Sequence, residues 1–159
     1  MINSVITLNS VEERLATFVA KSRYKNNRDK NIHNSKIGDQ SDYLTDLNGF
    51  GAELAFSKLF NCYPDMSIFT RDASNDTGDV KLPNGMTVDV KTTTYPTGKL
   101  LAVIWKKNTV DLYALMIGSF PTYTFKGFMK SNELLVPERI GNLGHGETYI
   151  AKQHELYDI

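Results

Sequence analysis

The spacing of apolar residues changes at Pro64, and this change constrains the fold more than any other feature of the sequence. Before Pro64, apolar residues recur every three or four positions, which is typical of amphipathic helices. After it, they form short runs rich in β-branched and aromatic residues, which is typical of strands. Two helices followed by several strands predict an α+β or mixed α/β fold. The 159 residues fit a single domain.

The two predicted helices are separated by a polar, basic segment. Ser10 and Glu13 form a capping-box pattern, which predicts a helix from about Val11 to Tyr24. A second helix is expected over Ser41–Phe60. Between them, Lys25–Ser41 lacks an apolar period and is expected to form a mobile loop. The buried stripe of the second helix is expected to consist of Leu44, Leu47, Leu54, Ala55 and Leu59.

Short runs after Pro64 predict the strands. They span Met66–Thr70, Gly78–Leu82, Met86–Thr92, Leu100–Lys106, Asp111–Ile117, Tyr123–Met129 and, near the end, Tyr149–Ala151. Ser131–Leu135 fits a helical turn and Gly141–Gly146 a glycine-rich loop. We therefore expect one domain with a helix and basic loop (1–41), a core of about 42–130 and a C-terminal extension (131–159).

Positive charge is concentrated in the segment from Lys21 to Lys36, although the net charge of the chain is zero. Such segregation can present a basic face to phosphates, and a solvated surface segment is the alternative. Trp105 precedes two further basic residues, Lys106 and Lys107, and is expected either to stack on bases or to lie in the core. The candidate nucleic-acid-binding residues are Lys21, Arg23, Lys25, Arg28, Lys30 and Lys36, followed by Lys99, Lys106 and Lys107.

The turn between two predicted strands determines which acidic side chains meet. Leu82-Pro83-Asn84-Gly85 fits a type I turn with its glycine in the left-handed position of a G1 bulge. This three-residue loop sets the pairs 81–87, 80–88 and 79–89. Asp79 is then expected directly opposite Asp89. Lys91 points to the same face because it lies two residues further along the strand.

These three side chains are a candidate site for metal-dependent hydrolysis. Paired Cβ atoms lie about 4.5–5.5 Å apart, so one Mg²⁺ can bridge the carboxylates of Asp79 and Asp89. Lys91 can orient or help deprotonate a water molecule, or stabilise charge on the phosphate. Glu53 is a third candidate acid, because no basic residue lies three or four positions from it in its helix. An ordinary surface hairpin and a solvent-exposed Glu53 are the alternatives.

At these positions the chain resembles the PD-(D/E)XK nuclease superfamily of restriction endonucleases, Holliday-junction resolvases and small phage members. The resemblance spans about 49–130 and rests on Gly49–Ala55, Gly78-Asp79-Val80 and Val88-Asp89-Val90-Lys91, with Gly78 in place of the proline. It implies a mixed central sheet flanked by helices and DNA cleavage with Mg²⁺ or Mn²⁺. It also implies that Glu53, Asp79, Asp89 and the backbone carbonyl of Val90 are metal ligands and that Lys91 is catalytic.

The remaining features bear on partners and compartment. A domain this small has little surface for wrapping a duplex, so we expect a homodimer on DNA. The single cysteine, Cys62, suggests a reducing compartment, and we expect a cytoplasmic protein without a membrane span. The resemblance to small phage members of the superfamily is consistent with a phage protein in a bacterial host. The three histidines lack the spacing of zinc ligands. Two competing hypotheses are a non-catalytic nucleic-acid-binding protein that retains the nuclease fold, and an interaction protein.

Overall fold

The computed structural model describes residues 1–31, 41–68, 78–105 and 109–159. These residues form a curled mixed sheet with helices against it, which confirms the predicted α+β class. The large sheet has the strand order β1-β6-β5-β3-β2, in which β3 and β5 are parallel and the other neighbours antiparallel. Its strands are β1 (Val5–Thr7), β2 (Val80–Lys81), β3 (Thr87–Thr93), β5 (Leu112–Ser119) and β6 (Thr122–Lys130).

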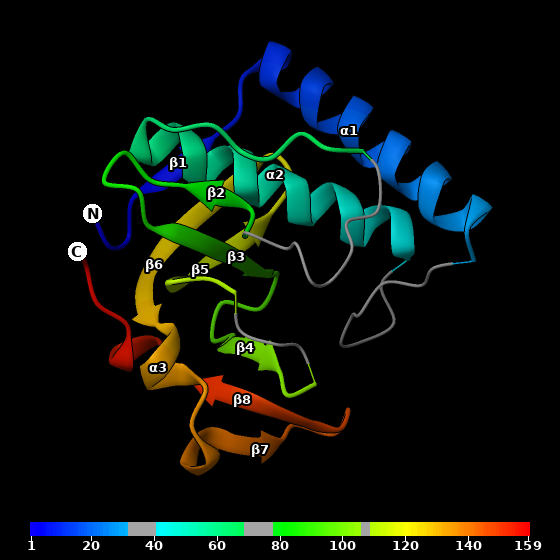
Figure 1. Cartoon of the computed structure of the whole chain (residues 1–159). Helices are drawn as coiled ribbons and strands as arrows, with labels where there is room; N and C mark the ends of the chain where they lie inside the picture. Colours follow the sequence, from blue (N-terminus) through cyan, green and yellow to red (C-terminus); the bar gives the residue numbers. More distant parts are fainter. Residues whose placement is uncertain (32–40, 69–77, 106–108) are drawn as a thin grey trace.

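The domain is built in layers (Figure 1). The two long helices, α1 (Ser10–Asp29) and α2 (Asp42–Phe60), lie on one face of the large sheet, with α2 between α1 and the strands. A small antiparallel sheet on the other side has the order β4-β8-β7. Its strands are β4 (Leu100–Val103), β7 (Ile140–Asn142) and β8 (Glu147–Ala151), and the short elements near it are α3 (Ser131–Leu134) and the 3₁₀ turns Pro137–Arg139 and Gln153–Glu155.

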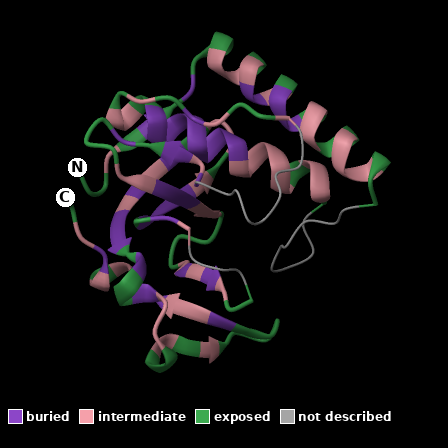
Figure 2. Ribbon diagram, viewed as in Figure 1, coloured by how far each residue is buried: buried purple, intermediate pink, exposed green. Residues whose placement is uncertain are grey.

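Two apolar clusters hold the layers together. The first lies between α2 and the large sheet, where four phenylalanine rings, Phe56, Phe60, Phe125 and Phe128, stack at centroid distances of 4.5–6.0 Å. The second joins the large sheet to the small one and includes Leu100, Leu115 and Leu134. Figure 2 shows that the buried residues concentrate in α2 and the central strands, while α1 is buried only on its inner side.

The first helix differs from its prediction at both ends. Asn9, and not Ser10, is the N-cap: its side chain accepts hydrogen bonds from the backbone of Val11 and Glu12, and Glu12 bonds back to Asn9. The helix also continues to Asp29, through residues predicted as loop. An ion pair between Arg28 and Asp42 (2.5 Å) and an edge-to-face contact of Tyr24 with Tyr43 link this extension to α2.

The other elements largely follow the prediction. Ser41 is the N-cap of α2, as expected, and the helix ends at Phe60. Leu44 is exposed, however, and the deepest residues of α2 include Phe50 and Phe56. Met66–Ile68 is not a strand, and the short strands β1 and β7 were not predicted. No helix in the described part of the chain is long and apolar enough to cross a bilayer.

The absence of a side chain at Gly51 allows α2 to approach β6. A Cβ atom at this position would lie 2.3 Å from the hydroxyl oxygen of Tyr123, which is fully buried and donates a hydrogen bond to the Asn48 carbonyl (3.2 Å). Gly49, two residues earlier in the same helix, has no atom within 4 Å of the equivalent position. Close packing therefore requires glycine at position 51 and not at position 49.

Gly51→Ala is expected to destabilise the fold by about 1–3 kcal/mol, because the Tyr123 ring must move. Gly49→Ala, the matched control, should be neutral or stabilise by about 0.5–1 kcal/mol, because alanine favours the helix. Urea unfolding measures both effects. Combining Gly51→Ala with Tyr123→Phe removes the clashing oxygen and should recover part of the loss. Equal effects of the two alanine substitutions would contradict the packing argument.

Candidate active site

The predicted turn between β2 and β3 is confirmed. The backbone N–H of Leu82 donates to the Met86 carbonyl and that of Gly85 to the Leu82 carbonyl, both at 2.9 Å. Gly85 has a φ of +90°, the left-handed conformation expected of a G1 bulge. The pairs 80–88 and 81–87 also form as predicted. The turn therefore sets the register that pairs β2 with the first two residues of β3.

The third predicted pair, 79–89, does not form, because the ladder ends at Val80. The backbone N–H of Asp79 donates to the Val88 carbonyl (2.9 Å), and its carboxylate accepts the backbone N–H of Val90 (2.8 Å). Gly78 makes this bend possible: its φ is +88°, and a Cβ there would lie 2.8 Å from the Val88 carbonyl oxygen. Asp79 thus reaches β3 from the strand edge instead of standing opposite Asp89.

Asp89 and Lys91 form the centre of the site. Asp89 is only 4% exposed, and its carboxylate lies 2.6 Å from the amine of Lys91, whose side chain is 37% exposed. Burial acts to lower the pKa of Lys91, but the carboxylates of Asp89 and Asp79 outweigh it and raise the pKa. Tyr113, which sequence reasoning missed, pairs with Asp89 in the parallel register and also contributes to this raised pKa.

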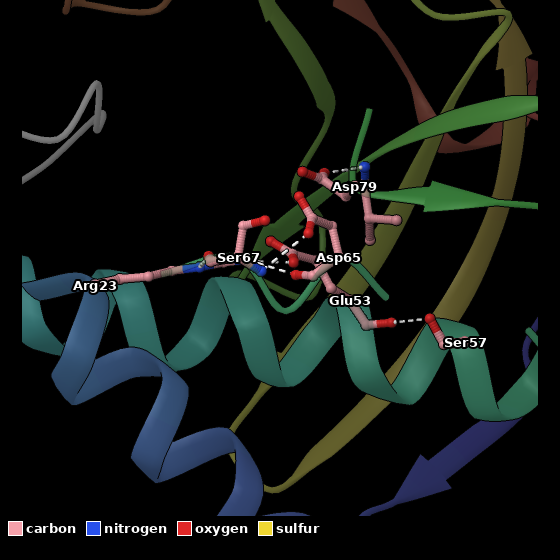
Figure 3. Close-up of polar contacts among 7 residues, drawn as sticks. Arg23, Glu53, Ser57, Asp65, Ser67 and Asp79 are labelled. Carbon is pink, nitrogen blue, oxygen red and sulfur yellow. Dashed lines mark hydrogen bonds and ion pairs between the residues drawn. The ribbon is translucent and has the colours of Figure 1, made fainter. Parts of the chain in front are cut away.

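Glu53 is buried, with 7% of its surface exposed. Burial, and then the negative charges of Asp79 and Asp89, raise its pKa to about 8, while Arg23 acts in the opposite direction. Figure 3 shows Glu53 extending from α2 toward Asp79. The charges of Asp79 and Asp89 thus act on both Glu53 and Lys91, so the two aspartates are common neighbours of the other two predicted site residues.

Glu53 forms its ion pair with Arg23 of α1, since no basic residue lies one turn away from Glu53 in α2. One guanidinium nitrogen lies 3.4 Å from the Glu53 carboxylate, and the other two donate to the carbonyls of Asp65 (2.7 Å) and Ser67 (3.0 Å) (Figure 3). The guanidinium also lies over the Phe50 ring, at 4.9 Å from its centroid. The sequence carries a signal for this inward position, because the helical spacing of the buried residues of α1, at positions 16, 19 and 20, continues to Arg23.

Five of the other predicted nucleic-acid-binding residues lie in the part of the chain that the structure describes. Lys21 and Lys25 are exposed, Lys30 is exposed at the end of α1, and Lys99 is half-buried before β4. Arg28 pairs with Asp42. Trp105 is 70% exposed and so is not a core residue. The remaining candidates, Lys36, Lys106 and Lys107, lie outside the described residues.

No group of three or more His, Cys, Asp and Glu side chains is arranged to hold a metal ion among the residues that the structure describes. The acids instead contact donors and cations of the protein: Asp89 contacts Lys91, Glu53 contacts Arg23, and Asp79 contacts the Val90 N–H. Their chemistry nevertheless fits a hard divalent cation, because all are carboxylates and repel one another. Lys91 contacts Oδ1 of Asp89, so coordination of a cation through that oxygen would require Lys91 to move away from it.

Glu53→Gln tests the electrostatic environment of α2. The folded-state pKa of Glu53, about 8, is above its ordinary value of 4.5, so the contribution of this group to stability is complete below pH 4.5 and is lost as the pH rises toward 8. We therefore compare the unfolding free energy of Glu53→Gln with that of wild type, in EDTA, at about pH 5 and about pH 8. The difference, variant minus wild type, should be roughly 1–3 kcal/mol larger at the higher pH.

Urea unfolding of both proteins at the two pH values measures this gain. Glu138→Gln, at an exposed turn, is the control for removal of an acid without burial. If the two proteins differ in unfolding free energy by the same amount at both pH values, the buried, negatively charged environment described for Glu53 is contradicted.

Comparison with known proteins gives a family but no activity. None of the curated proteins searched matches the chain. The sequence model of one protein family matches residues 2–158, a span that includes all four site residues as well as the small sheet. The chain therefore belongs to the family described as "Family of unknown function (DUF5843)".

Proposed function

We propose that this protein is a metal-dependent DNA nuclease that cuts phosphodiester bonds as an endonuclease. The observation that carries the proposal is the convergence of Glu53, Asp79 and Asp89 beside Lys91. Two of these acids are buried, and buried like charges are costly unless cations compensate them. Clusters of this kind are more often functional than structural, because the core gains little from them.

Asp79 and Asp89 are the proposed ligands of a Mg²⁺ or Mn²⁺ ion, and Glu53 completes or extends this set. The resemblance to PD-(D/E)XK nucleases adds the Val90 carbonyl, whose residue already contacts Asp79 through its N–H. When bound, the cation would supply Lewis-acid activation of water and neutralise charge on the phosphate. All the side-chain donors are oxygen atoms, which supports Mg²⁺ or Mn²⁺ over zinc.

Lys91 is the proposed catalytic residue. Its side chain is partly exposed while its amine contacts Asp89, so the amine can turn from the carboxylate toward a phosphate in solvent. There it can donate a hydrogen bond to a phosphate oxygen or orient the attacking water. Asp89 has the complementary role: its carboxylate would hold the cation that activates the water.

Lys91→Ala should reduce cleavage by at least about 100-fold, the loss typical of removing one group that stabilises transition-state charge. Lys81→Ala is the matched control, because Lys81 is exposed on the neighbouring strand of the same hairpin. The measurement is the initial rate on supercoiled plasmid, linear duplex, single strand, four-way junction and RNA, with Mg²⁺, Mn²⁺ or EDTA. Equal rates for Lys91→Ala and wild type would refute the assigned role.

A folded wild-type protein that cuts none of these substrates would overturn the nuclease proposal. Metal-independent binding of nucleic acid without product would then favour the non-catalytic binding protein. Loss of cutting in Asp89→Asn, together with loss of the increase in melting temperature that Mg²⁺ gives to wild type, would support the proposed ligand set. Stabilisation by bound ligand is about 2.7 kcal/mol at 100 times the dissociation constant, which is readily measured.

We also propose that two copies act together on DNA. The described residues of one chain offer a single cluster of this kind, and a duplex has two strands to cut, so a symmetric dimer would present one cluster to each strand. Light scattering after size exclusion, with and without a duplex in Ca²⁺, measures the stoichiometry. Two chains per duplex are expected, and one chain per duplex at micromolar concentration would contradict the dimer.

A further inference from the structure

Arg23 connects three parts of the proposed site that are distant in sequence. It lies on α1 and is half-buried, and its three guanidinium nitrogens each reach a different acceptor. One acceptor is the Glu53 carboxylate on α2 (3.4 Å), and the other two are the carbonyls of Asp65 and Ser67 (2.7 and 3.0 Å). The planar fork of arginine can satisfy this arrangement, whereas the single nitrogen of a lysine cannot.

The contacts of Arg23 continue to the second proposed ligand. The backbone N–H of Asp65, whose carbonyl Arg23 holds, donates to the Asp79 carbonyl (2.8 Å). The Asp79 carboxylate in turn accepts the Val90 N–H (2.8 Å). The Asp65 carboxylate accepts the Ser67 N–H (2.9 Å), which closes the segment into a turn around the guanidinium. Arg23 therefore supports Glu53 directly and Asp79 through one backbone hydrogen bond.

We propose that Arg23 is a positioning residue of the nuclease site and does not bind DNA, although it lies in the most basic part of the sequence. The inference rests on the proposed function. Arg23 holds Glu53 in its buried position and fixes the backbone at Asp79, so it sets the geometry with which these acids meet a divalent cation. Lys21, two residues earlier, is exposed on the far side of α1, about 200° around the helix. The same basic segment thus has an inner, structural face and an outer, solvent-exposed face.

The test compares Arg23→Lys with wild type and with Lys21→Gln as the matched surface control. Four quantities are measured well below the melting temperature of each protein: kcat, KM, the Mg²⁺ concentration for half-maximal cleavage, and DNA affinity in Ca²⁺ as a function of salt. Arg23→Lys should lower kcat by about 10–100-fold and raise the Mg²⁺ requirement, the size typical of residues that orient metal ligands. Its DNA affinity and salt dependence should equal those of wild type.

Two results would overturn the inference. One is a kcat and Mg²⁺ dependence of Arg23→Lys equal to those of wild type. The other is a weaker, less salt-dependent DNA affinity with a normal kcat, which would identify Arg23 as a phosphate contact. A wild type that cleaves nothing refutes the proposed function instead, and Mn²⁺ calorimetry then decides the role of Arg23. Weaker Mn²⁺ binding by Arg23→Lys supports the role, whereas unchanged affinity, or no binding by wild type, rejects it.

Discussion

Burial of acidic side chains beside one another is the constraint on which the rest of this structure depends. Glu53 and Asp89 are almost fully buried, and Asp79 lies close enough to Glu53 for its negative charge to raise the Glu53 pKa. Such carboxylates repel each other unless cations lie beside them. Arg23 of α1 lies beside Glu53 of α2, and Lys91 lies beside Asp89 within β3. One ion pair therefore links the two helices, while apolar packing joins the helices to the large sheet.

The arrangement also explains how a cluster of acids can exist without forming a ready-made metal site in the described residues. Each acid has a partner within the protein, and two of these partners are cationic side chains. On the proposed function, Lys91 is the partner that moves, because its side chain reaches solvent, and Arg23 is the partner that stays, because it is held by two backbone carbonyls and the Phe50 ring. One cation is then catalytic and the other maintains geometry.

Local sequence signals predicted most of the helices and strands. They failed where contacts between residues distant in the sequence determine the backbone conformation. The turn before Met86 and its register were predictable, because proline and glycine restrict the backbone locally. The bend at Gly78 was not, since it depends on the Val88 carbonyl packed against the glycine. The continuation of α1 to Asp29 depends on Asp42 of the next helix. The local charge pattern predicts that Arg23 contacts DNA, whereas its spacing from Ala16 and Val19 places it on the buried face of α1.

The most direct test of the proposed metal site is a crystal structure of the protein with Mn²⁺, located by anomalous scattering. One Mn²⁺ is expected within about 2.1–2.3 Å of carboxylate oxygens of both Asp79 and Asp89. The Lys91 amine is also expected to have left Asp89 while Arg23 still contacts Glu53. A Mn²⁺-soaked crystal in which Lys91 remains bonded to Asp89 and no ion lies between the two aspartates would contradict the proposed metal site.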